Sequence, residues 1–338
     1  MYYFDCKKLS SARTQIMGLA MLAVVLFHSS VDVSGSYLIS FIHKSGDIGV
    51  DIFFLMSGMG IYFSVQKYRD TRTYFQSRLR RILPAYFLVN GMWFLLQDFV
   101  LNQYGISTFL LDITSLNFWI DGRLTTWYLS SLILLQLLTP CYLHFWEKNP
   151  RFNMYCITGV YFAAAVICLV PYINQTAGHL LIFIFRIPAY LVGLAIGKQI
   201  EHSKIIPVRK IMVWAVVLLC IAVIMLAYGY FPVYIPWALK YAAYLPLAII
   251  LSFLATYIPA NQLTAYMGIR SLEIYLLHEK ILWLLSATVR KLLPTALDNH
   301  WIVNIIAIAV ALWGAEFLRR LLAALTGHFA ERISKKNE

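Results

Sequence analysis

Long apolar stretches alternate with short polar segments along nearly the whole chain. An apolar run of about 20 residues is long enough to cross the hydrocarbon core of a bilayer as a helix. The pattern, together with the intervening Pro, Gly and charged residues, predicts about ten membrane-spanning helices. We expect them over residues 14–33, 48–65, 82–99, 125–145, 152–170, 179–197, 211–228, 237–257, 271–289 and 301–322.

The composition agrees with a membrane location. Of the 338 residues, 60% are hydrophobic and 13% are charged. Such a chain would expose extensive apolar surface if it folded as a soluble domain. We therefore expect an all-α integral membrane protein, a polytopic bundle that forms one domain over residues 1–338 without a fused soluble domain. No small-residue cleavage site follows the first apolar run, so we expect that run to remain as a helix.

Positive charges are unequally distributed between the predicted loops. Most of the 28 Lys and Arg residues fall on the side that holds both termini. Cytoplasmic loops carry such an excess, so we expect both termini in the cytoplasm. The same bias explains most of the net charge of +12 without a nucleic-acid partner. The five cysteines form no Cys-x-x-Cys pair and no ligand set with histidine, so we expect no metal site.

Two titratable side chains stand inside the first two predicted helices. His28 lies in a run that has no Lys, Arg or Glu. Polar groups are costly in hydrocarbon and are usually retained for function, although a neutral histidine bonded to a neighbouring carbonyl is the alternative. Asp51 follows Asp47 by one turn, and we expect it to orient a histidine or arginine from another helix. Asp47 itself fits a helix-start residue at the outer interface.

Arginines gather where the third predicted helix meets the cytoplasmic side. Arg78 and Arg81 stand three residues apart at this edge. Guanidinium groups bind phosphate well, so the pair is suited to the phosphates of a nucleotide-containing donor. No glycine-rich phosphate loop accompanies them. Lys67, Arg69 and Arg72 in the same loop fit the ordinary cytoplasmic excess of positive charge.

Further charged side chains occur in the sixth and ninth predicted helices. An unpaired guanidinium inside a span would be costly, so we expect Asp51 or Glu273 as the partner of Arg186. Glu273 and His278 are five residues apart on one helix, and each should therefore meet a different neighbour. In the fourth helix, Trp127 and Tyr128 fit either an interfacial aromatic belt or a platform on which a sugar stacks.

Several blocks along the chain share a pattern with one known family. The blocks are an arginine, a small residue and an apolar run before His28, then residues 49–58, Arg78 and Arg81 with Pro84 and Tyr86, residues 126–129, residues 186–193 followed by Gly197, and residues 271–278. In this order they resemble the membrane-bound acyltransferase family 3, the acyltransferase-3 family. The resemblance covers about four-fifths of the chain.

This resemblance implies an O-acyltransferase. Such an enzyme takes an acyl group, usually acetyl, from cytoplasmic acyl-CoA and transfers it to a hydroxyl of an extracytoplasmic or lipid-linked carbohydrate. It implies a multi-pass protein of the bacterial plasma membrane. The expected partners are the bilayer, acyl-CoA as co-substrate and the carbohydrate acceptor, with no tightly bound cofactor.

The resemblance and the local patterns together give the candidate site residues. We expect His28 as the general base, with Asp51 fixing its tautomer, and a covalent acyl-histidine intermediate is the alternative. The expected donor-binding residues are Arg13, Arg78, Arg81 and Arg186, and the expected acceptor-binding residues are Trp127, Tyr128, Glu273 and His278.

The first helix departs from the pattern of the family. The family has an arginine eleven residues before the histidine, and that position is Met17 here. Eleven residues correspond to about three turns, so the family's arginine and histidine share one face. Arg13 lies one turn further toward the cytoplasm on nearly the same face. We hypothesise that Arg13 substitutes for the missing cation; otherwise this member binds its donor differently or has lost acyl transfer.

A transporter or flippase for a saccharide or small solute is the alternative function. A bundle with buried charges and a polar conduit fits it as well, and no thioester would then be consumed. The sequence shows no paired interrupted helices in corresponding halves, which counts against an inverted-repeat carrier. A catalytically silent scaffold is a third interpretation, encouraged only by Met17.

Overall fold

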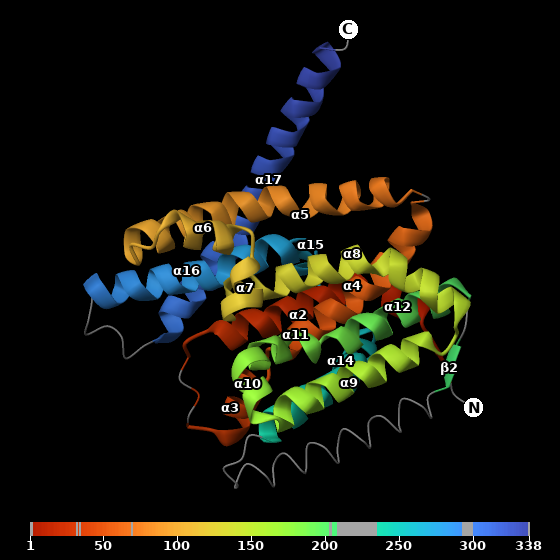
Figure 1. Cartoon of the computed structure of the whole chain (residues 1–338). Coiled ribbons are helices and arrows are strands. Elements are labelled where there is room, and N and C mark those ends of the chain that lie inside the picture. Colours follow the sequence, from red (N-terminus) through yellow and green to blue (C-terminus); the bar gives the residue numbers. More distant parts are fainter. Residues whose placement is uncertain are drawn as a thin grey trace. The chain divides into compact units, whose positions relative to one another are not determined.

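The computed structural model describes residues 3–31, 33, 35–68, 70–202, 205–207, 235–292 and 300–336. In this part of the chain nearly all regular structure is helical, as expected (Figure 1). The only strands among the described residues are β1 (Tyr3–Asp5) and β2 (Ile205–Pro207), which pair antiparallel with Phe4 opposite Ile206.

The helices follow the apolar pattern of the sequence. In the first half of the chain they are α1 (Lys7–Ser11), α2 (Arg13–His28), α3 (Tyr37–Lys44), α4 (Ile48–Lys67), α5 (Thr71–Phe94), the π-helix η1 (Leu95–Leu101), α6 (Ile106–Ile113), α7 (Leu116–Asp121), the 3₁₀-helix η2 (Leu124–Thr126) and α8 (Trp127–Lys148). In the second half they are α9 (Phe152–Leu169), α10 (Pro171–Ala177), the 3₁₀-helix η3 (Gly178–Leu180), α11 (Leu181–Ile184), α12 (Ile187–Glu201), α14 (Ile235–Ala255), α15 (Gln262–Ile269), α16 (Ser271–Leu292) and α17 (His300–Lys336).

Five helical segments of the described residues are long and apolar enough to cross a membrane. They are Tyr37–Lys67, Leu124–Lys148, Phe152–Leu169, Tyr172–Glu201 and Trp301–Leu325. The shorter segments Arg13–His28 and Lys240–Ala255 are also apolar. These segments support the expected membrane protein, while the number of ten crossings and the cytoplasmic location of both termini stay predictions.

Every predicted span within the described residues coincides with a helix, but three differ in detail. The first helix ends at His28 instead of continuing to residue 33, and the third continues into η1. The sixth is interrupted at Phe185 and Arg186, just before Pro188. Because proline lacks an N–H and favours the first turn of a helix, α12 begins there as a new helix. The predicted span 211–228 lies outside the described residues.

The chain divides into two compact units. Unit 1 comprises Met1–Ile16, Ile48–Phe75 and Thr114–Ala260, and unit 2 comprises Met17–Asp47, Gln76–Ile113 and Asn261–Glu338. The expectation of one domain over the whole chain stays a prediction.

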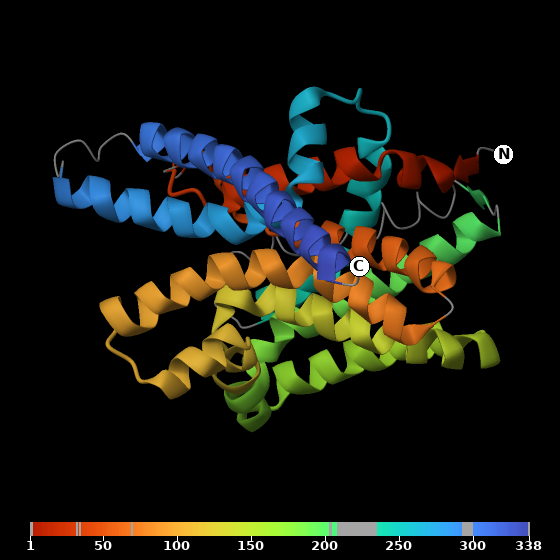
Figure 2. The ribbon, with the colours of Figure 1, turned by 90° about the horizontal axis from the view of Figure 1, so that it is seen from above.

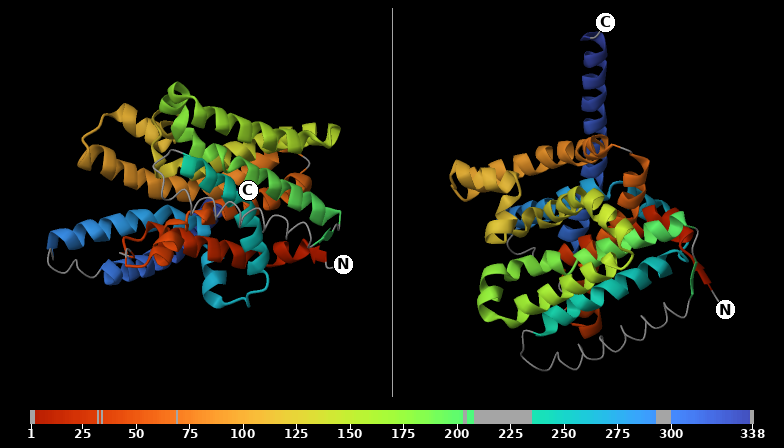
Figure 3. Two further views of the ribbon diagram at one scale, coloured as in Figure 1. Left: turned by 90° about the horizontal axis from the view of Figure 1, so that it is seen from below. Right: turned by 45° about the vertical axis from the view of Figure 1, so that its right-hand side comes forward.

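Helix α4 is the centre of unit 1, where α8, α12 and α14 all pack against it (Figure 3). Its backbone lies closest to α12. A Cβ atom added at Gly58 would lie 2.1 Å from the Tyr190 carbonyl oxygen, and one added at Gly193 would lie 2.1 Å from that of Leu55. Small residues at such positions let two helices approach each other closely.

In unit 2, α16 and α17 lie side by side (Figure 2). Helix α2 approaches α15 so closely that a Cβ atom added at Gly18 would clash with the Thr264 backbone. Helix α5 contacts α16 through the Trp93 and Trp283 rings, whose centroids are 5.5 Å apart. In the same unit, the C-terminal end of α2 lies beside α16.

Candidate functional site

His28 and His278 form a pair in unit 2. His28 is the last residue of α2 and is exposed, whereas His278 lies within α16 with 1% of its surface exposed. Their ring centroids are 5.1 Å apart, with one ring edge-on to the other at 69°. The sequence predicts His28 as the base and His278 as an acceptor-binding residue. Their pairing is a finding of the structure, and acceptor binding by His278 stays a prediction.

The surroundings of His278 define its tautomer. Its Nδ1 atom lies 3.0 Å from the Ile274 carbonyl oxygen and 2.9 Å from that of Tyr275. Carbonyl oxygens only accept hydrogen bonds, so we assign the proton to Nδ1. The buried Nε2 atom has no hydrogen-bond partner among the described residues. In a neutral His278, Nε2 is therefore a hydrogen-bond acceptor near the ring of His28.

Two carboxylates act electrostatically on His28, those of Glu279 and Asp47. Asp47 is buried just before α4, and Glu279 follows His278 on α16. Neither carboxylate was predicted as part of the site, although Asp47 precedes the predicted second span and Glu279 follows the last family block, residues 271–278. Carboxylates near an imidazole favour its charged form, so these two would stabilise an imidazolium at His28.

Asp51 and Arg186 form an ion pair inside unit 1. The Arg186 Nε atom lies 3.4 Å from the Asp51 Oδ2 atom, and each side chain is 1% exposed. The guanidinium also lies 5.0 Å from the Trp127 ring centroid and 4.8 Å from that of Tyr241, and its Nη1 atom donates to the Ile182 carbonyl. Of the two expected partners of Asp51, a histidine or an arginine from another helix, the structure shows the arginine.

This ion pair bears on three of the expected roles. The contacts of Arg186 are those of a buried structural group, so its role in donor binding stays a prediction that its geometry does not favour. The same holds for Asp51 as the tautomer partner of His28. Trp127 presents a ring face to Arg186, and its stacking on an acceptor sugar stays a prediction as well.

Tyr128 is buried, with 7% of its surface exposed. Its ring packs edge-on against Phe54 at 5.2 Å and lies 6.1 Å from Phe53. This surrounding fits a packing residue of unit 1 better than an interfacial belt. A part in acceptor binding stays a prediction.

Arg13 lies against α4. Its Nε atom donates to the Met56 carbonyl at 3.4 Å, and a Cβ atom added at Gly60 would lie 3.3 Å from its Nη2 atom. The absence of a side chain at Gly60 thus makes room for the guanidinium. Arg13 also acts electrostatically on Tyr128. Whether it replaces the cation missing at Met17 stays a prediction.

Glu273 lies among arginines. The cations of Arg81, Arg319 and Arg270 act on its carboxylate. Glu273 thus lies near Arg81, an expected donor-binding residue, and its own role in acceptor binding stays a prediction. Arg78 is half-buried and Arg81 exposed, and their binding of donor phosphates stays a prediction.

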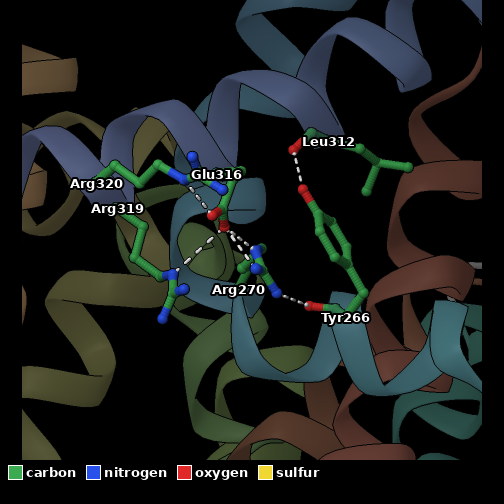
Figure 4. Close-up of polar contacts among 6 residues, drawn as sticks. All are labelled: Tyr266, Arg270, Leu312, Glu316, Arg319 and Arg320. Carbon is green, nitrogen blue, oxygen red and sulfur yellow. Dashed lines mark hydrogen bonds and ion pairs between the residues drawn. The ribbon is translucent and has the colours of Figure 1, made fainter.

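A second arginine cluster and two buried carboxylates were not predicted from the sequence. Glu316 on α17 pairs with Arg270, Arg319 and Arg320 (Figure 4). The i, i+3 and i+4 spacing on α17 is the signal that could have found it. Asp98 in η1 and Asp112 in α6 are also buried. Within the described residues there is no group of three or more His, Cys, Asp or Glu side chains suited to a metal ion.

The described residues thus combine long apolar helices with a histidine pair and a separate arginine cluster. The family model described as an acyltransferase domain, Acyl_transf_3, matches residues 16–318. The chain therefore belongs to the acyltransferase-3 family, as its motifs indicated, and this membership favours acyl transfer over a transporter. No curated protein and no solved structure matches the chain.

Proposed function

We propose that this protein is a membrane O-acyltransferase of the bacterial plasma membrane. It transfers an acyl group, acetyl above all, from cytoplasmic acyl-CoA to a hydroxyl of an extracytoplasmic or lipid-linked carbohydrate. Membership of the acyltransferase-3 family supports acyl transfer. The observation that carries the assignment of the reaction centre is the contact between His28 and His278.

His28 acts as the general base. Its unprotonated nitrogen takes the proton of the acceptor hydroxyl while the hydroxyl oxygen attacks the thioester carbonyl. The C–S bond then breaks, and the leaving thiolate takes the proton from the His28 imidazolium. The carboxylates of Asp47 and Glu279 stabilise that imidazolium while it exists.

His278 is a positioning residue for His28. Its Nδ1–H is held by two backbone carbonyls, so only Nε2 is left to accept a hydrogen bond. A centroid separation of 5.1 Å permits a hydrogen bond between one nitrogen of each ring. If the N–H of His28 donates to His278, the other nitrogen of His28 remains a base that faces the acceptor.

The donor is bound by cations on the cytoplasmic side. Arg78 and Arg81 at the start of the third span hold phosphates of acyl-CoA. Arg13 supplies the positive charge that the family places at Met17, from a position fixed by the Met56 carbonyl and the space at Gly60.

Transfer of labelled acetyl groups tests this function. Purified wild-type protein in liposomes should move label from acetyl-CoA into a base-labile, ester-linked fraction of a carbohydrate-containing membrane extract. General acid–base catalysis contributes roughly 10²–10⁴-fold, so His28→Ala should lower the rate by about that factor. Arg13→Ala should raise the KM for acetyl-CoA. Full transfer by a folded and inserted His28→Ala protein would overturn the proposal.

A further inference from the structure

The carboxylate of Glu316 on α17 is bound by three arginines of unit 2 (Figure 4). Its Oε2 atom lies 2.5 Å from both the Nε and Nη2 atoms of Arg270 and 3.4 Å from Nε of Arg319. Its Oε1 atom accepts a hydrogen bond of 2.6 Å from Nε of Arg320. One carboxylate thus binds Arg319 and Arg320 of its own helix together with Arg270, which lies between α15 and α16.

Arg270 is held in turn by Tyr266. The guanidinium carbon lies 3.8 Å from the Tyr266 ring centroid, and the Nη1 atom donates to the Tyr266 carbonyl at 3.4 Å. The Tyr266 hydroxyl donates to the Leu312 carbonyl on α17 at 2.8 Å. The Arg270 side chain is only 13% exposed. It therefore anchors Glu316 and is not itself open to a ligand.

Arg319 and Arg320 differ from Arg270 in exposure. Their side chains are 48% and 77% exposed, and each uses its Nε atom to bind Glu316. No contact of their Nη atoms is found within the described residues. Three arginines and one glutamate leave two positive charges on the cluster. Both guanidinium groups are thus held by one carboxylate, and their outer nitrogens remain available.

An ordinary cytoplasmic excess of charge does not require such an arrangement. It needs only exposed Lys and Arg, and a glutamate among them reduces the net positive charge. Glu316 reduces the net charge, but it also fixes the orientation of the two guanidinium groups. Binding sites for anions gain affinity when their donor groups are oriented before the anion binds. The pair lies immediately beyond residue 318, where the family match ends.

The cluster around Glu316 lies near Arg81 of the proposed donor site. Arg81, Arg270 and Arg319 all act on the carboxylate of Glu273. The same end of unit 2 therefore carries both the arginine assigned to donor phosphates and the cluster around Glu316.

We propose that Arg319 and Arg320, set in place by Glu316 and Arg270, bind the 3′-phosphate of acyl-CoA. This inference rests on the proposed function, because it assigns a further contact of the same donor. The 3′-phosphate is a monoester and carries close to two negative charges near neutral pH, which matches the charge of the cluster. The phosphodiester of a common membrane lipid carries one.

Binding of CoA and of dephospho-CoA, which lacks the 3′-phosphate, tests this inference on the purified full chain in detergent. Loss of charge-assisted hydrogen bonds to one phosphate costs about tenfold or more in affinity. Wild type should therefore bind CoA at least about tenfold more tightly than dephospho-CoA. Arg319→Ala/Arg320→Ala should remove that difference. The matched control Lys335→Ala/Lys336→Ala removes two charges from the same helix and should retain it.

Glu316→Gln tests the positioning role by the sign of its effect. If Glu316 only offset charge, the substitution would raise the net charge of the cluster and tighten CoA binding. The proposal requires that losing the carboxylate releases Arg319 and Arg320, so binding of CoA should weaken several-fold. Binding of dephospho-CoA should change little, a result that a general loss of structure would not give.

Three outcomes would overturn the inference. If wild type and Arg319→Ala/Arg320→Ala discriminate equally between CoA and dephospho-CoA while His28-dependent turnover persists, the inference fails and the proposed function stands. If the double variant instead loses only sedimentation with phosphatidylglycerol vesicles, the arginines serve a lipid headgroup. A wild type that neither binds CoA nor consumes acetyl-CoA would contradict the proposed function as well.

Discussion

Asp51 and Arg186 place two opposite charges where unit 1 excludes solvent. Each charge pays a desolvation cost that its partner and the surrounding aromatic faces offset. The cost of an unpaired guanidinium was sufficient to name Asp51 as one of two expected partners of Arg186. The ion pair is therefore a feature that elementary electrostatics predicts from sequence.

Asp51→Asn should lower the free energy of unfolding by about 3–5 kcal/mol, because it leaves the Arg186 cation buried without a counter-charge. Unfolding in detergent by heat or denaturant provides the measurement. The double variant Asp51→Asn/Arg186→Gln should be destabilised by less than the sum of the two single variants. Additive effects would show that the two charges do not interact.

The pairing of His28 with His278 was not predictable in the same way. The two residues are far apart in the sequence, and no charge pattern relates them. Only the packing of α2 with the C-terminal helices brings the rings together. Glu316 escaped notice for a different reason. In the sequence, its arginine partners on α17 fit the ordinary cytoplasmic excess of positive charge, and Arg270 comes from outside that helix.

At the scale of elements, the close approach of α4 and α12 organises unit 1. The apolar pattern predicted both helices, and a small residue such as Gly58 is typical of a position where a neighbouring helix approaches closely. The identity of that neighbour required the structure, since many predicted spans carry glycine. Gly193 faces α4 from the partner helix.

Gly58→Ala and Gly193→Ala should each lower stability by about 1–3 kcal/mol, because the added methyl group forces the two backbones apart. Gly159→Ala on α9 is the matched control, since an added Cβ atom there meets nothing within 4 Å. Thermal unfolding of the three variants in one detergent makes the comparison. Equal stability of all three would contradict the close packing of α4 and α12.

The start of α5 predicts a dependence on pH. Asp70 accepts hydrogen bonds from the backbone N–H and hydroxyl of Thr73 and from the N–H of Arg72, which lower the pKa of its carboxyl below 3.8. The ionised cap therefore stabilises the helix at neutral pH, and this contribution is lost as the pH falls below about 4. Asp70→Ala should lower the melting temperature at pH 7, and this effect should diminish as the pH falls below about 4. A constant difference across that range would exclude the carboxylate as the cause.

For the whole molecule, alternating hydropathy predicted the helical class and the order of the family motifs predicted the family. Helix ends were predicted less well, because α2 ends at His28 inside the apolar run and Pro188 starts a new helix at α12. The division into two units was not expected, since hydropathy carries no information on which helices pack together.

The predicted orientation is testable with reporter fusions. With ten crossings and cytoplasmic termini, a fluorescent protein that folds only in the cytoplasm should be active at the C-terminus. Alkaline phosphatase, which needs an oxidising compartment, should be active when inserted between the first two spans. The opposite pattern would reverse the orientation and remove the argument that the arginine clusters meet a cytoplasmic donor.

The most direct test of the central claim is release of CoA thiol from acetyl-CoA by the purified protein, with and without a carbohydrate-containing membrane extract. We predict turnover by wild type and a decrease of about 10²-fold or more in His28→Ala. His144→Ala, which removes an exposed histidine from another apolar helix, should retain full turnover. Turnover that is equal in wild type and in folded His28→Ala would contradict the account.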